Sequence, residues 1–278
     1  MILGLLLRSD ELLLAIRSGD DRWEFRRCDV NWTESTDDAA RGYIWDRLDN
    51  DLRIAYQEAD TLAVALPASE CMVKQVELEK KVEDEIPGYR KWRAGIELPG
   101  EPDLFGYGFI PSMQDSDRGR SEMVFFAVPA DFLHGLTQAL IRENDSREIQ
   151  FVPEQIGLAW LALKSAADYS QLALAHFDRE HAVVIILRDG RFFKARYFGS
   201  GNGNNEEVAV DIETFLLSMA GHDESLPLIV TGSPGRLKID WNPRVPAFLD
   251  ERELEFSSVW GITEFITRGG RCELQVGN

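Results

Sequence analysis

The sequence predicts a two-lobed α/β protein in which a β-β-β-α-β unit occurs twice and a smaller α+β module is inserted between the copies. Two observations carry this prediction. Three short apolar runs separated by polar turns open the chain, and the same pattern returns just after residue 170. The stretch between the copies follows a different, more charged pattern. The predicted domains are a first lobe at residues 1–68, the inserted module at 69–150 and a second lobe at 151–278.

Each unit begins with three predicted strands, because short apolar runs bounded by turn-forming residues are typical of strands. In the first unit these runs are residues 1–7, 12–17 and 23–30. In the second unit they are residues 172–177, 181–187 and 191–198. The turns between the first two strands of each unit carry charged side chains.

A helix and a fourth strand complete each unit. In the first unit we expect a helix that starts near Asp37 and Asp38, where negative charge is favourable, and carries apolar residues at helical spacing up to Tyr56. The apolar run at residues 62–66 is the fourth strand. In the second unit the helix is predicted at residues 206–219 and the strand at 226–231.

The inserted module is predicted to be a small α+β fold. Its strands are expected at residues 73–78, 104–110 and 123–128, and its helices at 82–94 and 131–143. After the module, an apolar helix at residues 153–167 is expected to tie the lobes together. A helix at residues 257–266 closes the fold, and the polar residues 265–278 are interpreted as an exit segment.

Composition and charge describe an ordinary globular protein and exclude several classes of function. Hydrophobic residues make up 44% and charged residues 28%, and 48 acidic against 30 basic residues give a net charge of -18. So acidic a chain is not expected to bind nucleic acid, because basic residues that neutralise phosphates supply most of that affinity. The apolar runs are far shorter than the roughly 20 residues of a membrane helix. Three widely spaced cysteines are typical of a reduced, cytoplasmic protein.

No residue pattern in the sequence predicts a catalytic or metal site. His176 and His181 bracket an acidic turn, but their spacing matches no standard zinc signature. No serine has the context of a nucleophile elbow, and no two cysteines form a C-x-x-C pair. We therefore expect no catalytic residue and no bound metal.

The duplicated unit with its inserted module resembles the actin-like ATPase superfamily, whose lobes share the RNase H-like β-β-β-α-β arrangement. The module and the segment after it read MVKQVELEKKVEDEIPGYRKWRAGIELP, DLFGYGFIP, SEMVFFAVPADFLHGLTQALIREN and REIQFVPEQIGLAWLAL. This order of segments is similar to the PilM family of type IV pilus assembly proteins. It is similar also to the cytoplasmic part of the L component of type II secretion systems. The resemblance spans nearly the whole chain and implies a two-lobed actin-like fold with a shortened second lobe.

The chain departs from this resemblance where the family binds ATP. In the family, the turn between the first two strands of each lobe is a glycine-rich phosphate loop, whose backbone N–H groups approach the phosphates. Here the two positions read GLLLRSDE at residues 4–11 and HFDREH at 176–181, with carboxylates in place of glycines at the turns. A carboxylate close to a phosphate oxygen costs about 1–4 kcal/mol at a surface-like dielectric. We therefore expect no bound nucleotide cofactor and no enzymatic activity.

The adenosine loop of the family survives in part as Thr231, Gly232 and Ser233, which we interpret as vestigial. Two alternatives remain open. One is an active nucleotide-binding ATPase of the same family that uses Thr231 and Gly232. The other is a relative of the sugar kinases, for which Asp178 lies near the position of a catalytic aspartate.

Without ATP hydrolysis, the resemblance implies a cytoplasmic scaffold at the inner face of the inner membrane, in a type IV pilus or type II secretion machine. Its implied partners are the secretion or pilus assembly ATPase and a bitopic inner-membrane assembly protein. We expect the chain to meet the membrane only through such a partner or through a segment that follows residue 278.

Tyr89, Trp92 and Arg93 are the candidate partner-binding residues. A tryptophan among basic residues on an acidic protein is typical of an interface anchor, because Trp, Tyr and Arg dominate binding hot spots. The alternative is that Trp92 belongs to the core and its basic neighbours extend to solvent.

Overall fold

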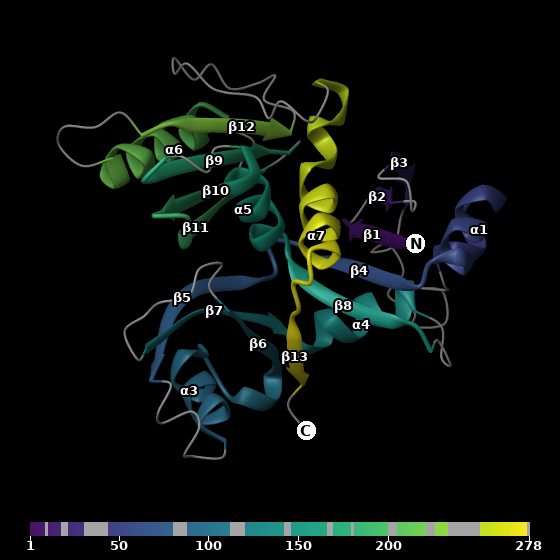
Figure 1. Cartoon of the computed structure of the whole chain (residues 1–278), viewed down its shortest axis with the longest axis horizontal. Coiled ribbons are helices and arrows are strands. Elements are labelled where there is room, and N and C mark those ends of the chain that lie inside the picture. Colours follow the sequence, from purple (N-terminus) through teal and green to yellow (C-terminus); the bar gives the residue numbers. More distant parts are fainter. Residues whose placement is uncertain are drawn as a thin grey trace.

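The computed structural model has the predicted α/β fold class, with three sheets and several helices (Figure 1). The structure describes residues 1–8, 11–17, 22–30, 44–79, 88–111, 120–141, 146–165, 169–178, 181–199, 205–220, 226–232 and 251–276. No helix within these ranges is long and apolar enough to cross a membrane.

The first lobe is built on a five-stranded sheet with the order β3-β2-β1-β4-β8. Its strands are β1 (Ile2–Leu7), β2 (Glu11–Arg17), β3 (Trp23–Asp29), β4 (Thr61–Leu66) and β8 (Glu148–Pro153). The first three strands pair antiparallel, and β4 lies parallel to both β1 and β8. β1, β2 and β4 are buried along nearly their whole length, which explains why they read as continuous apolar runs.

The second lobe repeats this arrangement in a four-stranded sheet with the order β11-β10-β9-β12. Its strands are β9 (Gln171–Phe177), β10 (His181–Arg188), β11 (Arg191–Gly199) and β12 (Leu228–Gly232). The pairings match those of the first lobe, with β12 parallel to β9 and the other neighbours antiparallel. The duplicated unit predicted from the sequence is therefore present.

The helices that follow the third strands differ between the lobes. In the second lobe, one long helix, α6 (Asn205–Ala220), agrees with the prediction. In the first lobe the expected single helix is divided into a short 3-10 turn, η1 (Ile44–Arg47), and α1 (Asn50–Glu58). Trp45 of η1 is buried, and its indole N–H donates to the Leu140 carbonyl at 2.9 Å. Asp37 and Asp38 lie outside the described residues.

The inserted module forms a third sheet with the order β13-β6-β7-β5. Its elements are β5 (Met72–Glu79), α3 (Tyr89–Glu97), η2 (Pro102–Leu104), β6 (Phe105–Pro111), β7 (Arg120–Pro129), α4 (Ala130–Leu140) and the C-terminal β13 (Glu273–Val276). Helix α3 covers one face of this sheet, with its own small core around Phe125. The module also reaches the second lobe, where Arg191 of β11 pairs with Glu122 of β7 at 2.8 Å.

The C-terminal residues do not form the exit segment that was predicted. β13 pairs antiparallel with β6, so that Glu273 lies opposite Phe109 and Val276 opposite Gly106. The prediction was wrong because the segment is short and polar, and the strand whose edge it completes lies far away in the sequence.

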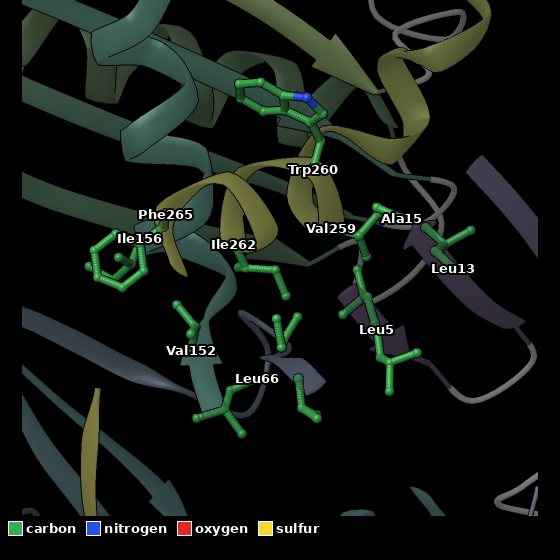
Figure 2. Close-up of a cluster of buried hydrophobic side chains, with 14 of the residues drawn as sticks. Leu5, Leu13, Ala15, Leu66, Val152, Ile156, Val259, Trp260, Ile262 and Phe265 are labelled. Atoms are coloured by element: carbon green, nitrogen blue, oxygen red, sulfur yellow. The ribbon is translucent and has the colours of Figure 1, made fainter. Parts of the chain in front are cut away.

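Two helices cross between the lobes: α5 (Glu154–Ser165) and α7 (Ser257–Thr267), which follows the 3-10 turn η3 (Glu251–Phe256). They approach closely because both carry glycine at the crossing. A Cβ added to Gly261 would lie 2.2 Å from the Gly157 carbonyl oxygen. Figure 2 shows the apolar side chains of α7, among them Val259 and Ile262, between α5 and the strands of the first lobe.

The domain boundaries proposed at residues 68, 150 and 151 remain a prediction, but the packing distributes the last part of the chain differently. β8 spans the division at residue 150 and pairs with β4 of the first lobe. Helix α7 packs against β1, where a Cβ added to Gly4 would lie 2.0 Å from the Thr263 hydroxyl oxygen. Residues 257–276 therefore lie with the first lobe and the module. The sequence could not show this, since long-range pairing decides it.

Candidate functional site

The turns between the first two strands of the two lobes are equivalent and face each other. In each turn a backbone N–H donates to a carbonyl three residues later, from Arg8 to Glu11 and from Asp178 to His181, both at 2.9 Å. Arg8 and Asp178 thus occupy the same position in the two copies. The tips of the turns, residues 9–10 and 179–180, lie outside the described residues, so the carboxylates predicted there are not placed.

An ion pair between these two equivalent residues joins the lobes. Nη1 of Arg8 lies 2.8 Å from Oδ2 of Asp178 and 2.9 Å from Oε1 of Glu11, and Nη2 lies 3.3 Å from Oε1 of Glu154. All four side chains are nearly buried. The Arg8 guanidinium is therefore shared among three carboxylates in the space between the two turns.

Glu154, the first residue of α5, connects this cluster to both lobes. Its Oε2 accepts a hydrogen bond from the Ala68 backbone N–H at 3.0 Å, and its Oε1 accepts one from the Ser258 hydroxyl at 2.6 Å. His176 of β9 completes the cluster, with Nε2 4.0 Å from Oε1 of Glu154. A carboxylate this deeply buried is retained only where it is paired and hydrogen-bonded, and Glu154 has both kinds of partner.

Burial and charge fix the protonation of the two central groups. Burial alone would raise the pKa of Glu154, but the opposing effects of Arg8, His176 and the Ser258 hydrogen bond outweigh it and lower that pKa to about 2. Burial lowers the pKa of His176 to about 4, although the nearby Glu154 carboxylate acts in the opposite direction. At neutral pH, Glu154 is therefore ionised and His176 is neutral.

The space left beside this cluster is small. A cavity of about 30 Å³ lies between the lobes. Its lining residues are Arg8, Glu11, Leu13, Arg27, His176, Phe177, Asp178 and Glu255. Among the described residues, this cavity has room for ordered water. Arg27 is also paired, with Glu11 at 2.7 Å and Glu255 at 3.3 Å, so the acidic groups at the cavity outnumber the basic ones.

A nucleotide, the cofactor that the fold implies, does not fit the described residues. Its phosphates would have to enter between the two turns, where carboxylates of Glu11 and Asp178 already surround Arg8. Among the described residues, no group of three or more His, Cys, Asp or Glu side chains is arranged to hold a metal ion.

The three residues predicted as a vestigial adenosine loop have structural roles or are not placed. Thr231 is fully buried, and its hydroxyl is within hydrogen-bond distance of Nδ1 of His176, at 3.0 Å. Gly232 has a φ of 81°, and a Cβ there would lie 1.9 Å from the Phe177 carbonyl oxygen. The pairing of β12 with β9 is therefore sufficient to explain glycine at this position, without a bound ligand. Ser233 lies outside the described residues.

The three predicted partner-binding residues lie together on α3. Trp92 is 61% exposed, so the alternative that it belongs to the core is wrong. Its ring stacks on that of Tyr89, with centroids 5.7 Å apart. Arg93 is instead turned to Glu97, with Nη2 2.6 Å from Oε1. This surface and the ion-pair cluster are separate parts of the molecule.

The sequence analysis missed Arg8 and Glu154, the two residues that carry most of the cluster. Each stands next to an apolar run, after Leu7 and after Pro153, which is the only sequence signal that marks them. A charged residue beside an apolar run suggests that the charge is partly buried. It does not identify which distant residue pairs with it.

The duplicated sheets, the two facing turns and the pair of central helices together form the fold of the actin-like ATPases, as comparison with solved structures shows. No protein-family model matches the sequence, and no curated protein matches it. Solved structures do match. A chain of the PilM-PilN type IV pilus biogenesis complex is 14% identical, with a TM-score of 0.60 over 95% of this chain and 97% of that one.

Two further structures agree with this assignment of the fold. The cytoplasmic domain of EpsL, an inner membrane component of the type II secretion system of Vibrio cholerae, is 11% identical, with a TM-score of 0.55 over 92% of this chain and 93% of that domain. A Bacteroides thetaiotaomicron protein with an actin-like ATPase fold and unknown function is also 11% identical, with a TM-score of 0.51 over 95% and 88% of the two chains. The predicted resemblance to PilM and the L component is thereby confirmed at the level of the fold.

The pKa of His176 makes a prediction for the pH dependence of stability. Between pH 6.5, its value in an unfolded chain, and about pH 4, its value in the fold, the unfolded state binds more protons. The free energy of unfolding should therefore fall by about 1 kcal/mol per pH unit on acidification through this window. His176→Gln should remove that part of the slope, measured by urea unfolding at each pH. His134→Gln, a change of the exposed histidine on α4, is the matched control and should keep the slope. Equal slopes in both variants would contradict the assignment.

Proposed function

We propose that this chain is a non-catalytic cytoplasmic scaffold of a type IV pilus or type II secretion machine, which links an assembly ATPase to inner-membrane components. The observation that carries the loss of catalysis is the Arg8–Asp178 ion pair at 2.8 Å. It joins the two turns between which an actin-like ATPase would be expected to hold the phosphates of its nucleotide.

This ion pair opposes nucleotide binding in two ways. A phosphate between the turns would meet the carboxylates of Glu11 and Asp178. It could recruit Arg8 only by separating that guanidinium from its buried partners, and breaking a buried ion pair costs about 3–5 kcal/mol. The pair instead holds the lobes together without a ligand, which suits a protein that works as a fixed platform.

The likeness to proteins of two related machines supports the cellular role. The structures similar to this chain over nearly its whole length include a pilus biogenesis complex and a domain of an inner membrane component of a secretion system. The assembly ATPase and a bitopic membrane protein are therefore the partners we propose, with the chain at the inner face of the inner membrane.

Nucleotide binding is the property that tests this proposal most directly. We expect no change in melting temperature on addition of millimolar Mg-ATP or Mg-ADP, and no release of phosphate from ATP. A ligand present at about 100 times its dissociation constant would stabilise the fold by about 2.7 kcal/mol, which is readily measured. Magnesium alone is the control. A shift with either nucleotide would favour the second candidate, an active nucleotide-binding ATPase of the same fold.

A further inference from the structure

Helix α3 of the inserted module is fixed to the fold by one of its faces. Ala94 and Leu98 are buried against the module sheet, and Lys74 of β5 reaches the end of the helix. Nζ of Lys74 lies 2.6 Å from Oε2 of Glu97 and donates to the Glu97 carbonyl at 2.8 Å. The helix is thus anchored, and what its other face exposes is a fixed feature of the surface.

The opposite face of α3 exposes large apolar side chains. Trp92 and Ile96, one helical turn apart, are 61% and 54% exposed. The segment η2 lies near the helix, since Cγ of Pro102 is 4.0 Å from the position of a Cβ added to Gly95, and it adds Leu104 at 61% exposure. Single exposed apolar residues are ordinary, but three of the seven large ones among the described residues fall within this short stretch. We name Trp92, Ile96 and Leu104 the α3 patch.

The charges of α3 itself differ from those of the whole chain. The helix carries Arg90, Lys91 and Arg93 against the single acidic residue Glu97, whereas the molecule has a net charge of -18. Lys91 is exposed directly beside Trp92. A basic, tryptophan-containing surface on an acidic protein is complementary to an acidic segment. Its positive charge disfavours a basic segment at the same place.

The size of the α3 patch limits what can cover it. Three side chains offer a few hundred Å² at most, well below the roughly 800 Å² that each partner buries in a standard interface between folded proteins. An amphipathic helix or strand from a longer partner needs only such a surface. An anionic membrane is less suitable, because so extended a surface would face the wider acidic surface of the chain, net charge -18, as well as α3. A short segment can place its acidic residues at Arg90 and Lys91, away from the exposed Glu101 and Asp103 beside Leu104.

From these observations we infer that the α3 patch docks a short amphipathic segment of a partner protein, in which apolar side chains are accompanied by Asp or Glu. The inference deepens the proposed scaffold role by naming a surface and the chemistry of its partner. It makes no use of the ion-pair cluster between the lobes.

A display library of random 16-residue peptides, selected against the whole chain, tests the inference. Selected peptides should combine apolar residues with an excess of Asp and Glu. They should bind Trp92→Ser/Ile96→Ser at least tenfold more weakly than the unchanged chain. Val210→Ser/Leu217→Ser is the matched control, because these α6 residues are 60% and 61% exposed, and it should leave binding unchanged. All these residues are exposed, so melting temperatures should agree among the three proteins.

Other outcomes would overturn the inference. One is that the selected peptides bind the Trp92→Ser/Ile96→Ser variant with the same affinity as the unchanged chain. The others are that most selected peptides are basic, or that no binding peptide is recovered. Trp92-dependent binding to phosphatidylglycerol vesicles would identify a membrane surface, and Trp92-dependent dimerisation in sedimentation would identify a second copy. A melting shift with Mg-ATP alongside acidic peptides that map to α3 would refute the proposed loss of nucleotide binding and leave this surface in place.

Discussion

Arg8→Ala should lower the free energy of unfolding by about 3–5 kcal/mol at pH 7, because it leaves buried carboxylates without their shared counter-ion. Glu154 would be the most affected, since its side chain is almost inaccessible to water and Arg8 is the strongest influence holding its pKa low. Urea unfolding followed by tryptophan fluorescence measures the loss. Arg26→Ala is the control, because Arg26 and Glu24 form an ion pair with both side chains more than half exposed. Exposed pairs contribute about 0–1 kcal/mol.

The pH dependence identifies the cause of this loss. In the unchanged chain the pKa of Glu154 is about 2, below its ordinary 4.5, so its contribution to stability is present above pH 4.5 and is lost as the pH falls toward 2. Without Arg8, burial should keep the carboxyl protonated to higher pH. The difference between the two proteins should therefore be largest at pH 7 and shrink below about pH 4.5. Adding Glu154→Gln to Arg8→Ala should recover part of the stability. A loss no larger than that of Arg26→Ala would contradict this account.

Gly261→Ala should destabilise the fold by about 2–3 kcal/mol, although alanine is the better helix former. Its Cβ would lie 2.2 Å from the Gly157 carbonyl oxygen, and backbone on both sides leaves no flexible side chain to yield. Helices α5 and α7 would have to separate, and the packing around Ile262 drawn in Figure 2 would loosen.

The same substitution elsewhere supplies the control for Gly261. Gly95 also lies within a helix, α3, and the nearest atom to its added Cβ is 4.0 Å away on Pro102. Gly95→Ala should therefore stabilise the chain by about 0.5–1 kcal/mol. The measurement is the melting temperature of each variant relative to the unchanged chain, which should fall for Gly261→Ala and rise for Gly95→Ala. If the two substitutions had effects of the same sign, the close crossing of α5 and α7 would not be the determinant we describe.

Local patterns in the sequence were sufficient for much of the fold. The strands β1, β2, β9 and β10 are short apolar runs ended by charged turns, which is the pattern of strands buried on both faces. Their repetition predicted the second lobe. The exposure of Trp92 was left open, because basic neighbours can extend to solvent from a core position as well as from an exposed one.

The features that remained unpredicted depend on contacts between distant parts of the chain. Arg8 meets Asp178 only after both lobes have formed and packed, and neither residue has a local pattern that names the other. Gly232 illustrates another unpredicted feature. The sequence suggested a vestigial ligand loop, and the structure adds that a positive φ and the close Phe177 carbonyl make glycine necessary for the sheet.

The position of β13 has a consequence for how the chain is made. The module sheet is encoded mostly in the middle of the sequence, yet the edge of β6 stays open until Glu273–Val276 has been synthesised. Until then, the module presents unpaired backbone groups that could pair with another chain. The lobe that begins at the N-terminus is likewise without α7, which packs on β1. A nascent chain that stops before Ser257 would thus lack both α7 and β13, and such fragments should be strong substrates for chaperones and proteases.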